Sequence, residues 1–301
     1  MMSHANVVAA IGGIGSIVPE RINERDLYIA FLPLAHVLEL TAEMTVLSYG
    51  GALGFSSPLT LRDDGVCNAE GRPAGDLSKL RPTLMAAVPM ILERLRVGVQ
   101  EQVSKGPLVK RLMFRAAYAL KRRFYLRGEK TPLLDRLVFS KVAERFGGRV
   151  RYLLSGGAPL SGDTHEFTNI CVCAPVLQGY GLTETMCGGA ITHPDDRTTG
   201  NVGPPVGCCQ ILLHDEPEMG YTSADKPCPR GQICIGGPNV TQGYYGQPEL
   251  TAEAYFTDKH GVRYFMTGDI GQWEPNGTLK IIDRKKVRAC DTNTRASTRM
   301  R

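Results

Sequence analysis

Two short segments of this 301-residue chain hold the side chains best suited to chemistry. In the first, Gly179-Tyr180-Gly181 sets an aromatic ring between glycines, and Thr183 and Glu184 add a hydroxyl and a carboxylate. A purine needs a flat face, its phosphates need a donor, and magnesium needs a carboxylate. In the second segment, Asp269 follows a Thr-Gly pair and could accept hydrogen bonds from both hydroxyls of a ribose. Together the two segments outline a nucleotide site.

Each of these features also has a plainer interpretation. A tyrosine between glycines is as often part of a core, and a Thr-Glu pair can begin a helix with a capping role. Asp269 could be a turn residue, and Gly156-Gly157-Ala158-Pro159 has the composition of a turn. The presence of all these features in one chain favours the nucleotide interpretation.

Short apolar runs alternate with longer amphipathic stretches over the first 200 residues. Ser3 is a plausible N-cap for a helix that ends at Gly12-Gly13, and further helices are expected over 36–48, 90–95, 108–127 and 133–146. Strand-like runs cover 28–32, 84–88 and 150–154. This alternation predicts an α/β core over residues 1–200 with a largely parallel sheet, whose carboxyl edge carries the loops 156–159 and 179–181.

The sequence pattern changes after about residue 200. Glycine and proline pairs break it into short β-branched or aromatic runs, and Asn276-Gly277 is a strong hairpin signal. We therefore expect a β-rich lobe over residues 201–283. The stretch 284–301 begins with basic residues and continues as a polar tail without periodicity, for which disorder is expected.

Bulk properties are those of an ordinary globular protein, with 43% hydrophobic and 22% charged residues. The nine cysteines form no regular framework, which favours reduced thiols; Cys208-Cys209 with His214 is a weak candidate for metal binding. Neither a secretory signal nor a membrane-spanning run is recognisable. The net charge of +5 is concentrated in a few places, which argues against a general nucleic-acid binder.

The segment 105–130 is the most basic part of the chain. It sets a single acid, Glu129, against nine basic residues: Lys105, Lys110, Arg111, Arg115, Lys121, Arg122, Arg123, Arg127 and Lys130. Apolar residues such as Leu112, Met113 and Phe114 alternate with them. A helix that rests on anionic lipid has this pattern, and so does a solvated helix packed on a core. The sequence leaves both interpretations open and slightly favours the solvated helix.

In their order, residue types and spacing, these segments resemble those of the adenylate-forming ligases, and specifically of the long-chain acyl-CoA synthetases. The resemblance runs from Met1 to about Lys286. Its most specific part is TGDIGQWEPNGTLKIIDRKK, residues 267–286, which is similar to the signature of the fatty-acid branch. Activators of amino acids and aryl acids usually match only the two ends of this stretch, so an adenylate-forming enzyme for those acids is a less favoured alternative.

The resemblance implies a role for each matching residue. The loop of Gly156, Gly157, Ala158 and Pro159 would line the adenine, and Tyr180, between Gly179 and Gly181, would stack on it. Thr183 would contact the phosphates, Glu184 would hold Mg²⁺, Asp269 would bind the ribose and Arg284 would add a donor. His36 matches a position near the acyl carboxylate, although a structural role is as plausible for it. Asp283 matches the hinge to a small C-terminal domain.

The implied reaction joins a long-chain fatty acid to coenzyme A, with ATP consumed through an acyl-adenylate. The family implies the cytosolic face of intracellular membranes, such as the endoplasmic reticulum or the outer mitochondrial membrane, and a dimer is compatible with it. The phosphate loop and the small C-terminal domain of the family have no counterpart in the sequence. We therefore expect a partial large domain with little activity alone. The alternative is a non-catalytic nucleotide-binding fragment that pairs with a full-length subunit as a regulator.

Overall fold

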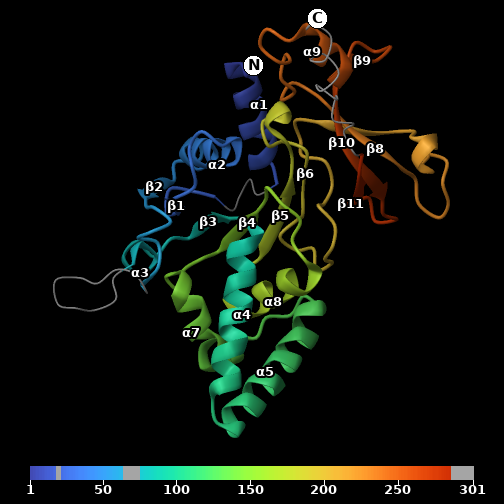
Figure 1. Ribbon diagram of the computed structural model, residues 1–301. Coiled ribbons are helices and arrows are strands. Elements are labelled where there is room, and N and C mark those ends of the chain that lie inside the picture. Colours follow the sequence, from blue (N-terminus) through green and yellow to red (C-terminus); the bar gives the residue numbers. More distant parts are fainter. Residues whose placement is uncertain (18–21, 64–74, 286–301) are drawn as a thin grey trace, which may run out of the picture.

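A mostly parallel sheet of six strands forms the centre of the computed structural model, which describes residues 1–17, 22–63 and 75–285 (Figure 1). Its strands run in the order β2-β1-β3-β4-β5-β6, and only β6 is antiparallel to its neighbour. Their bounds are β1 Leu27–Ala30, β2 Ala52–Phe55, β3 Leu84–Ala87, β4 Tyr152–Ser155, β5 Val176–Tyr180 and β6 Ala190–Ile191. The predicted α/β class and parallel sheet are confirmed. The short edge strand β2 was not predicted, because two of its four residues are exposed and its sequence has no alternation.

Helices cover both faces of this sheet. One face is covered by α1 (His4–Gly15) and α2 (Val37–Ser48), whose Ile14 and Val46 pack on strand residues such as Leu177 and Ala86. On the other face lie α3 (Asp76–Leu80), α4 (Pro89–Lys105) and α8 (Gly162–Val172). A further layer, farther from the sheet, contains α5 (Leu108–Leu126) and α7 (Ser140–Ala143), which pack on α4 and α8 (Figure 1). Burial on both faces explains why the central strands are apolar throughout.

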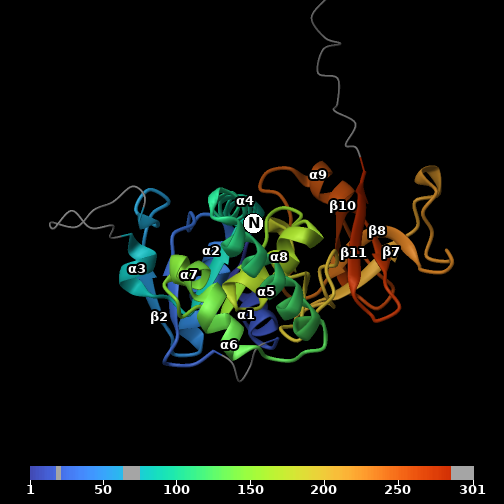
Figure 2. The ribbon, with the colours of Figure 1, turned by 90° about the horizontal axis from the view of Figure 1, so that it is seen from below.

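The second sheet is antiparallel and stands to one side of the α/β body (Figure 2). It contains β7 (Gln210–His214), β8 (Arg230–Gly236), β9 (Tyr255–Thr257), β10 (Arg263–Trp273) and β11 (Leu279–Arg284), with α9 (Pro248–Ala254) before β9. Gly277, at φ +80°, makes the turn between β10 and β11 where Asn276-Gly277 predicted a hairpin.

The helix α1 joins the two sheets. Ser3 caps it as predicted, and Asn6 Nδ2 donates to the carbonyl oxygens of Pro238 (2.8 Å) and Val240 (2.9 Å), beyond the end of β8. The prediction that this helix ends at Gly12-Gly13 is wrong, since it continues to Gly15. A Cβ on Gly13 would collide with the side chain of Cys208, so this glycine serves close packing rather than helix termination.

The predicted single helix over 133–146 is also wrong, because that stretch is divided into four short pieces. They are α6 (Pro132–Leu134), a π-helical turn η2 (Asp135–Phe139), α7 and a 3₁₀ turn η3 (Glu144–Phe146). The π-helical turn lets Asp135 form an ion pair with the buried Lys121 (2.6 Å) while Phe139 enters the core. These tertiary contacts override the helical spacing of the sequence.

Several other features can be stated for the described residues. No helix among them is long and apolar enough to cross a membrane, and they contain no cluster of three or more potential metal ligands. Their seven cysteines are free thiols. The predicted polar tail, residues 287–301, lies outside the described part of the chain.

Candidate functional site

A cavity of about 350 Å³ lies at the carboxyl ends of β4 and β5, on the side of the second sheet. This is the edge of a parallel sheet where ligands commonly bind. Eight of the residues chosen from the sequence line it: His36, Gly156, Gly157, Gly179, Gly181, Thr183, Glu184 and Arg284. The first seven belong to the α/β body, whereas Arg284 reaches the cavity from β11. The fold therefore gathers segments separated by up to 248 positions.

The loop after β4 forms one wall of the cavity. Gly157 has φ +82°, a conformation that other residues adopt only with strain. Gly156 is buried, while Ala158 and Pro159 are exposed and are not among the residues that line the cavity. The glycines therefore face the cavity, and the rest of the predicted adenine loop turns toward solvent.

A second wall follows β5, where Gly179 and Gly181 line the cavity on either side of Tyr180. A Cβ on Gly181 would collide with the carbonyl group of Cys187, so the backbone here requires glycine. The ring of Tyr180 packs against the core of the second sheet, and its hydroxyl donates to Asp269 Oδ2 at 2.8 Å. Burial and the neighbouring carboxylate both raise the pKa of Tyr180, which keeps this hydroxyl protonated as a donor.

Asp269 lies next to the cavity and is held from three sides. Its backbone N–H donates to Thr267 Oγ1 (3.1 Å), its Oδ2 accepts from Tyr180, and Arg284 Nε lies 3.2 Å from its Oδ1. The Asp269 side chain is 12% exposed and that of Arg284 is 74% exposed. A well-anchored carboxylate is thus paired with a solvent-facing cation that lines the cavity. A ribose could share the carboxylate by displacing the exposed guanidinium.

Thr183 and Glu184 begin a 3₁₀ turn, η4 (Thr183–Thr185), at the cavity wall. Thr185, not Thr183, performs the capping role, because its Oγ1 accepts the N–H of Leu182 at 3.1 Å. The Thr183 side chain is exposed and makes no hydrogen bond to a described residue. The capping interpretation of Thr183 and Glu184 is therefore wrong, and both side chains are available to a ligand.

Glu184 is oriented by a residue that the sequence interpretation missed. The hydroxyl of Tyr244 donates to Glu184 Oε1 at 2.8 Å, and burial followed by this carboxylate raises the pKa of Tyr244. The remaining oxygen, Oε2, accepts no hydrogen bond from a described residue. A signal was present, since Gly243-Tyr244-Tyr245-Gly246 repeats the aromatic-between-glycines pattern of Gly179-Tyr180-Gly181.

His36 combines a structural contact with a place on the cavity wall. It is the N-cap of α2, and its Nδ1 accepts the N–H of Leu38 at 3.1 Å. In the neutral ring the proton must then reside on Nε2, which is free to donate. The structural role considered for His36 is therefore real, and it leaves one nitrogen for a ligand.

A narrow apolar cavity of about 80 Å³ adjoins this site between the sheet and helices α1 and α2. Ile14, Leu154 and Ile191 line both cavities. The other residues around the narrow cavity are nearly all apolar: Ile17, Ile22, Tyr28, Ala42, Thr45, Val46, Leu84, Met85, Ala86, Tyr152 and Leu177. A polar site thus lies beside an apolar cavity with which it shares three lining residues, a combination that the sequence did not reveal because its residues come from separate segments.

Asp283 lies in β11, one residue before Arg284, and pairs with Ile270 of β10, next to a shift in register between the two strands. Its Oδ2 accepts from the hydroxyl of Tyr221 at 3.2 Å. Two residues further on, Lys285 Nζ lies 2.9 Å from both carboxylate oxygens of Glu216. The end of this strand is therefore fixed to the rest of the second sheet as far as residue 285, and the hinge role of Asp283 stays a prediction.

Comparison with known proteins identifies relatives of this chain. The sequence profile described as AMP-binding enzyme matches residues 1–245. Long chain acyl-CoA synthetase 8 of Arabidopsis thaliana is 46% identical over 295 residues, which cover 95% of this chain and 40% of the plant protein. Fatty acyl-CoA synthetase A of Dictyostelium discoideum is 40% identical over 286 residues, with 95% and 41% covered. The chain thus spans about two fifths of the length of these relatives.

Solved structures share the fold at lower identity. A long-chain-fatty-acid-CoA ligase from Archaeoglobus fulgidus superposes with a TM-score of 0.62 at 18% identity, covering 95% of this chain and 49% of that one. The inhibitor-bound N-terminal domain of FACL13 from Mycobacterium tuberculosis gives a TM-score of 0.61 at 22% identity, covering 93% and 55%. These similarities concern the arrangement of the two sheets and their helices.

Proposed function

This chain belongs to the AMP-binding enzyme family, and we propose that its cavity activates a long-chain fatty acid with ATP for transfer to coenzyme A. One observation carries the proposal: Thr183, Glu184 and Arg284 line one cavity, and Arg284 pairs with the Asp269 carboxylate that Tyr180 holds. A nucleotide needs donors for its phosphates and an acceptor for its ribose, and these groups supply both around a single space.

In this proposal the adenosine lies against the glycines of the two walls. Gly156 and Gly179 leave the backbone accessible to a flat base. The Tyr180 ring, which lies between the lining residues Gly179 and Gly181 but packs on the second-sheet core, would have to turn toward the cavity to stack on the base. Asp269 accepts from the ribose hydroxyls, while Arg284 moves from the carboxylate to the ribose or a phosphate. Stacking on an aromatic side chain contributes roughly 1–3 kcal/mol per base in other nucleotide binders.

The donor set fits a magnesium ion that arrives with the phosphates. Mg²⁺ is usually held by one or two carboxylates together with phosphate oxygens and water. Glu184 offers one carboxylate oxygen free of hydrogen bonds to described residues, and Tyr244 fixes the orientation of the other. When bound, the ion would neutralise charge on the phosphates. Thr183 would donate its hydroxyl to the same oxygens.

The adjoining apolar cavity, about 80 Å³, suits the first part of a fatty-acid chain next to its carboxylate and is too small for a whole long chain. Its lining buries hydrocarbon, and Ile14, Leu154 and Ile191 mark where it meets the nucleotide cavity. A carboxylate placed at that junction faces His36, whose Nε2–H could hold it. Attack of the carboxylate oxygen on the α-phosphorus forms the acyl-adenylate and releases pyrophosphate. The coenzyme A thiol then adds to the acyl carbonyl, and AMP leaves. A location at the cytosolic face of intracellular membranes would place the protein close to such a substrate.

The test is fatty-acid-dependent exchange of labelled pyrophosphate into ATP by the purified protein. We expect weak exchange, as for a partial large domain with little activity alone, and only with a long-chain fatty acid that an aryl acid or an amino acid does not replace. Exchange driven only by an aryl or amino acid would overturn the choice of substrate. Binding of ATP without any exchange would instead favour the alternative, a nucleotide-binding protein that regulates a catalytic partner.

A further inference from the structure

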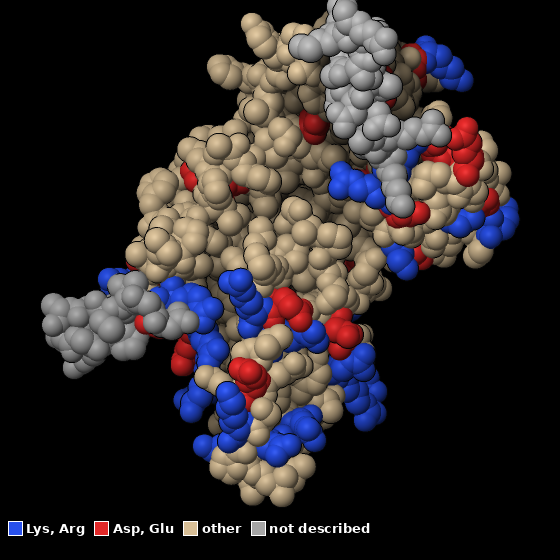
Figure 3. Space-filling view, viewed as in Figure 1, with Lys and Arg blue, Asp and Glu red and all other residues tan. Residues whose placement is uncertain are grey.

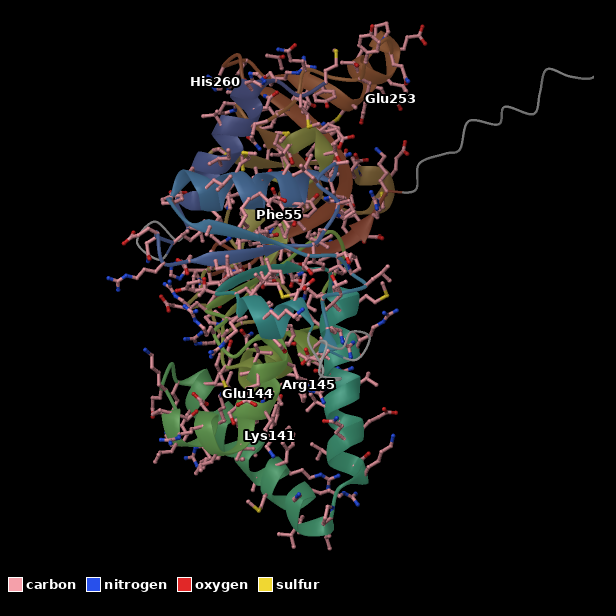
Figure 4. The ribbon with its side chains drawn as sticks, turned by 90° about the vertical axis from the view of Figure 1, so that its left-hand side faces the viewer. Phe55, Lys141, Glu144, Arg145, Glu253 and His260 are labelled. Carbon is pink, nitrogen blue, oxygen red and sulfur yellow. The ribbon has the colours of Figure 1, made fainter. Side chains whose placement is uncertain are left out.

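Helices α4 and α5 form a hairpin that extends away from the sheet, at the end of the molecule opposite α9 and the N-terminus (Figure 1). Gly106 and Pro107 make the turn at its tip. In Figure 4, the labelled Glu253 and His260 lie at one end of the long axis and this hairpin lies at the other. A surface that approaches this end of the molecule would therefore contact the hairpin before the rest of the described chain.

The two faces of α5 have different surroundings. On the inner face Ala117, Tyr118 and the buried Lys121 pack with α4, α7 and α8. On the outer face, next to the turn, four large apolar side chains are exposed: Leu108 (65%), Val109 (66%), Leu112 (55%) and Met113 (60%). Their spacing of one and four residues places them on one side of the helix. A helix that only packed on the core would bury its large apolar residues on the inner face, and these do not lie there.

Basic residues border this apolar tip. Lys105 and Lys110 flank the turn, and Arg111 and Arg115 line a cavity of about 520 Å³ between α4, α5 and α8. Figure 3 shows Lys and Arg side chains around the lower end of the molecule, where the hairpin lies. Neither Arg111 nor Arg115 forms an ion pair with any residue that the structure describes. Acidic groups are nearby, but Glu166 is paired with Arg122 (2.7 Å), and Glu101 lies 4.0 Å from Lys105. Asp163 is the other acid at this cavity.

We propose that this hairpin tip, residues 105–115, is a docking surface for an anionic lipid bilayer. Leu108, Val109, Leu112 and Met113 enter the interface between headgroups and acyl chains, and the surrounding Lys and Arg side chains contact lipid phosphates. A second copy of the chain is a poor occupant, because a two-fold contact would place each basic rim against its own copy. The proposal rests on the tip alone and does not require that the nucleotide site be active.

The first test measures co-sedimentation of the protein with vesicles of pure phosphatidylcholine and with vesicles that also contain phosphatidylserine. We expect binding to the anionic vesicles that falls as salt is added. The double variant Arg111→Glu and Arg115→Glu should weaken it by at least about tenfold. The matched control carries the same change of charge in the second sheet, Lys259→Glu in the loop between β9 and β10 with Lys280→Glu in β11, and should bind like the wild type.

The second test removes the apolar part of the tip. Leu108→Ser with Leu112→Ser should weaken vesicle binding without changing the circular dichroism spectrum, because both side chains are already exposed. Leu250→Ser, at an exposed leucine of α9, is the control and should have no effect.

Either of two results would overturn the proposal. One is equal binding of wild type and the arginine variant to anionic vesicles. The other is self-association of the wild type without vesicles, measured by sedimentation velocity, that the tip variants abolish. ATP binding, measured on the same preparations, reports separately on the nucleotide site.

Discussion

The hydroxyl of Tyr180 donates to Asp269 Oδ2 at 2.8 Å, which joins the last residue of β5 to the middle of β10. This bond connects the parallel sheet to the antiparallel sheet beside the cavity. It also fixes the tyrosine ring and the carboxylate relative to each other, so the proposed contacts to base and ribose are positioned as one unit. Arg284, on the other carboxylate oxygen, is the exposed and exchangeable member of the group.

Tyr180→Phe removes this bond and keeps the aromatic ring. We expect the free energy of unfolding to fall by roughly 1–2 kcal/mol, because a partly buried carboxylate loses a donor. ATP binding should also weaken, since Asp269 then keeps only the exposed Arg284 as a side-chain partner for its carboxylate. Urea unfolding and calorimetric titration with ATP measure the two effects. Tyr264→Phe is the control, because the Tyr264 hydroxyl has no partner among the described residues; an equal loss in both variants would contradict the prediction.

Glu184→Gln keeps the shape of the side chain and removes its charge. If this carboxylate holds the metal, pyrophosphate exchange should fall by about a hundredfold or more. Stability should hardly change, because the carboxylate accepts only the Tyr244 hydroxyl. Glu218→Gln, on the exposed 3₁₀ turn η5 (Pro217–Met219), is the matched control. Full activity of Glu184→Gln at saturating magnesium would remove this residue from the proposed site.

Gly181→Ala and Gly98→Ala should change stability in opposite directions. A Cβ at residue 181 meets the carbonyl of Cys187 and forces the backbone to shift, which should cost roughly 1–3 kcal/mol. At Gly98, within α4, a Cβ meets nothing within 4 Å, and the helix should gain about 0.5–1 kcal/mol. Thermal unfolding of the two variants tests the pair, and destabilisation by Gly98→Ala would show that the α4 surface is not as open as described.

Glu39 should make stability depend on pH. It is fully buried, its carboxylate accepts from the Tyr28 hydroxyl (2.5 Å) and the Leu32 N–H (3.3 Å), and burial raises its pKa. Because the pKa of Glu39 is raised in the folded state, its contribution to the free energy of unfolding is fully present below the unfolded pKa, near 4.3. This contribution is lost as pH rises through the folded-state pKa. Glu39→Gln lacks this dependence. The variant should therefore gain stability relative to the wild type as pH rises above the unfolded pKa, measured by urea unfolding at a series of pH values; a difference that stays constant would refute it.

Local signals in the sequence were sufficient for much of the fold. Ser3, the Asn276-Gly277 turn and the strand before Gly156 act through neighbouring residues, so their types fix the local backbone. Long-range packing decided the exceptions. The glycine at 13 accommodates Cys208 instead of ending its helix, and the stretch after Pro132 breaks because Asp135 must reach the buried Lys121.

The sequence alone determined which residue types stand at the site, because Tyr180, Glu184 and Asp269 lie in short segments with recognisable spacing. It could not determine how they are oriented. The contact of Tyr244 with Glu184 joins residues from different elements, and the exposure of the apolar tip of α5 depends on which face of that helix the other helices cover. Only the tertiary structure decided these, because the energy of a side-chain contact depends on distance and burial, which spacing along the chain does not encode.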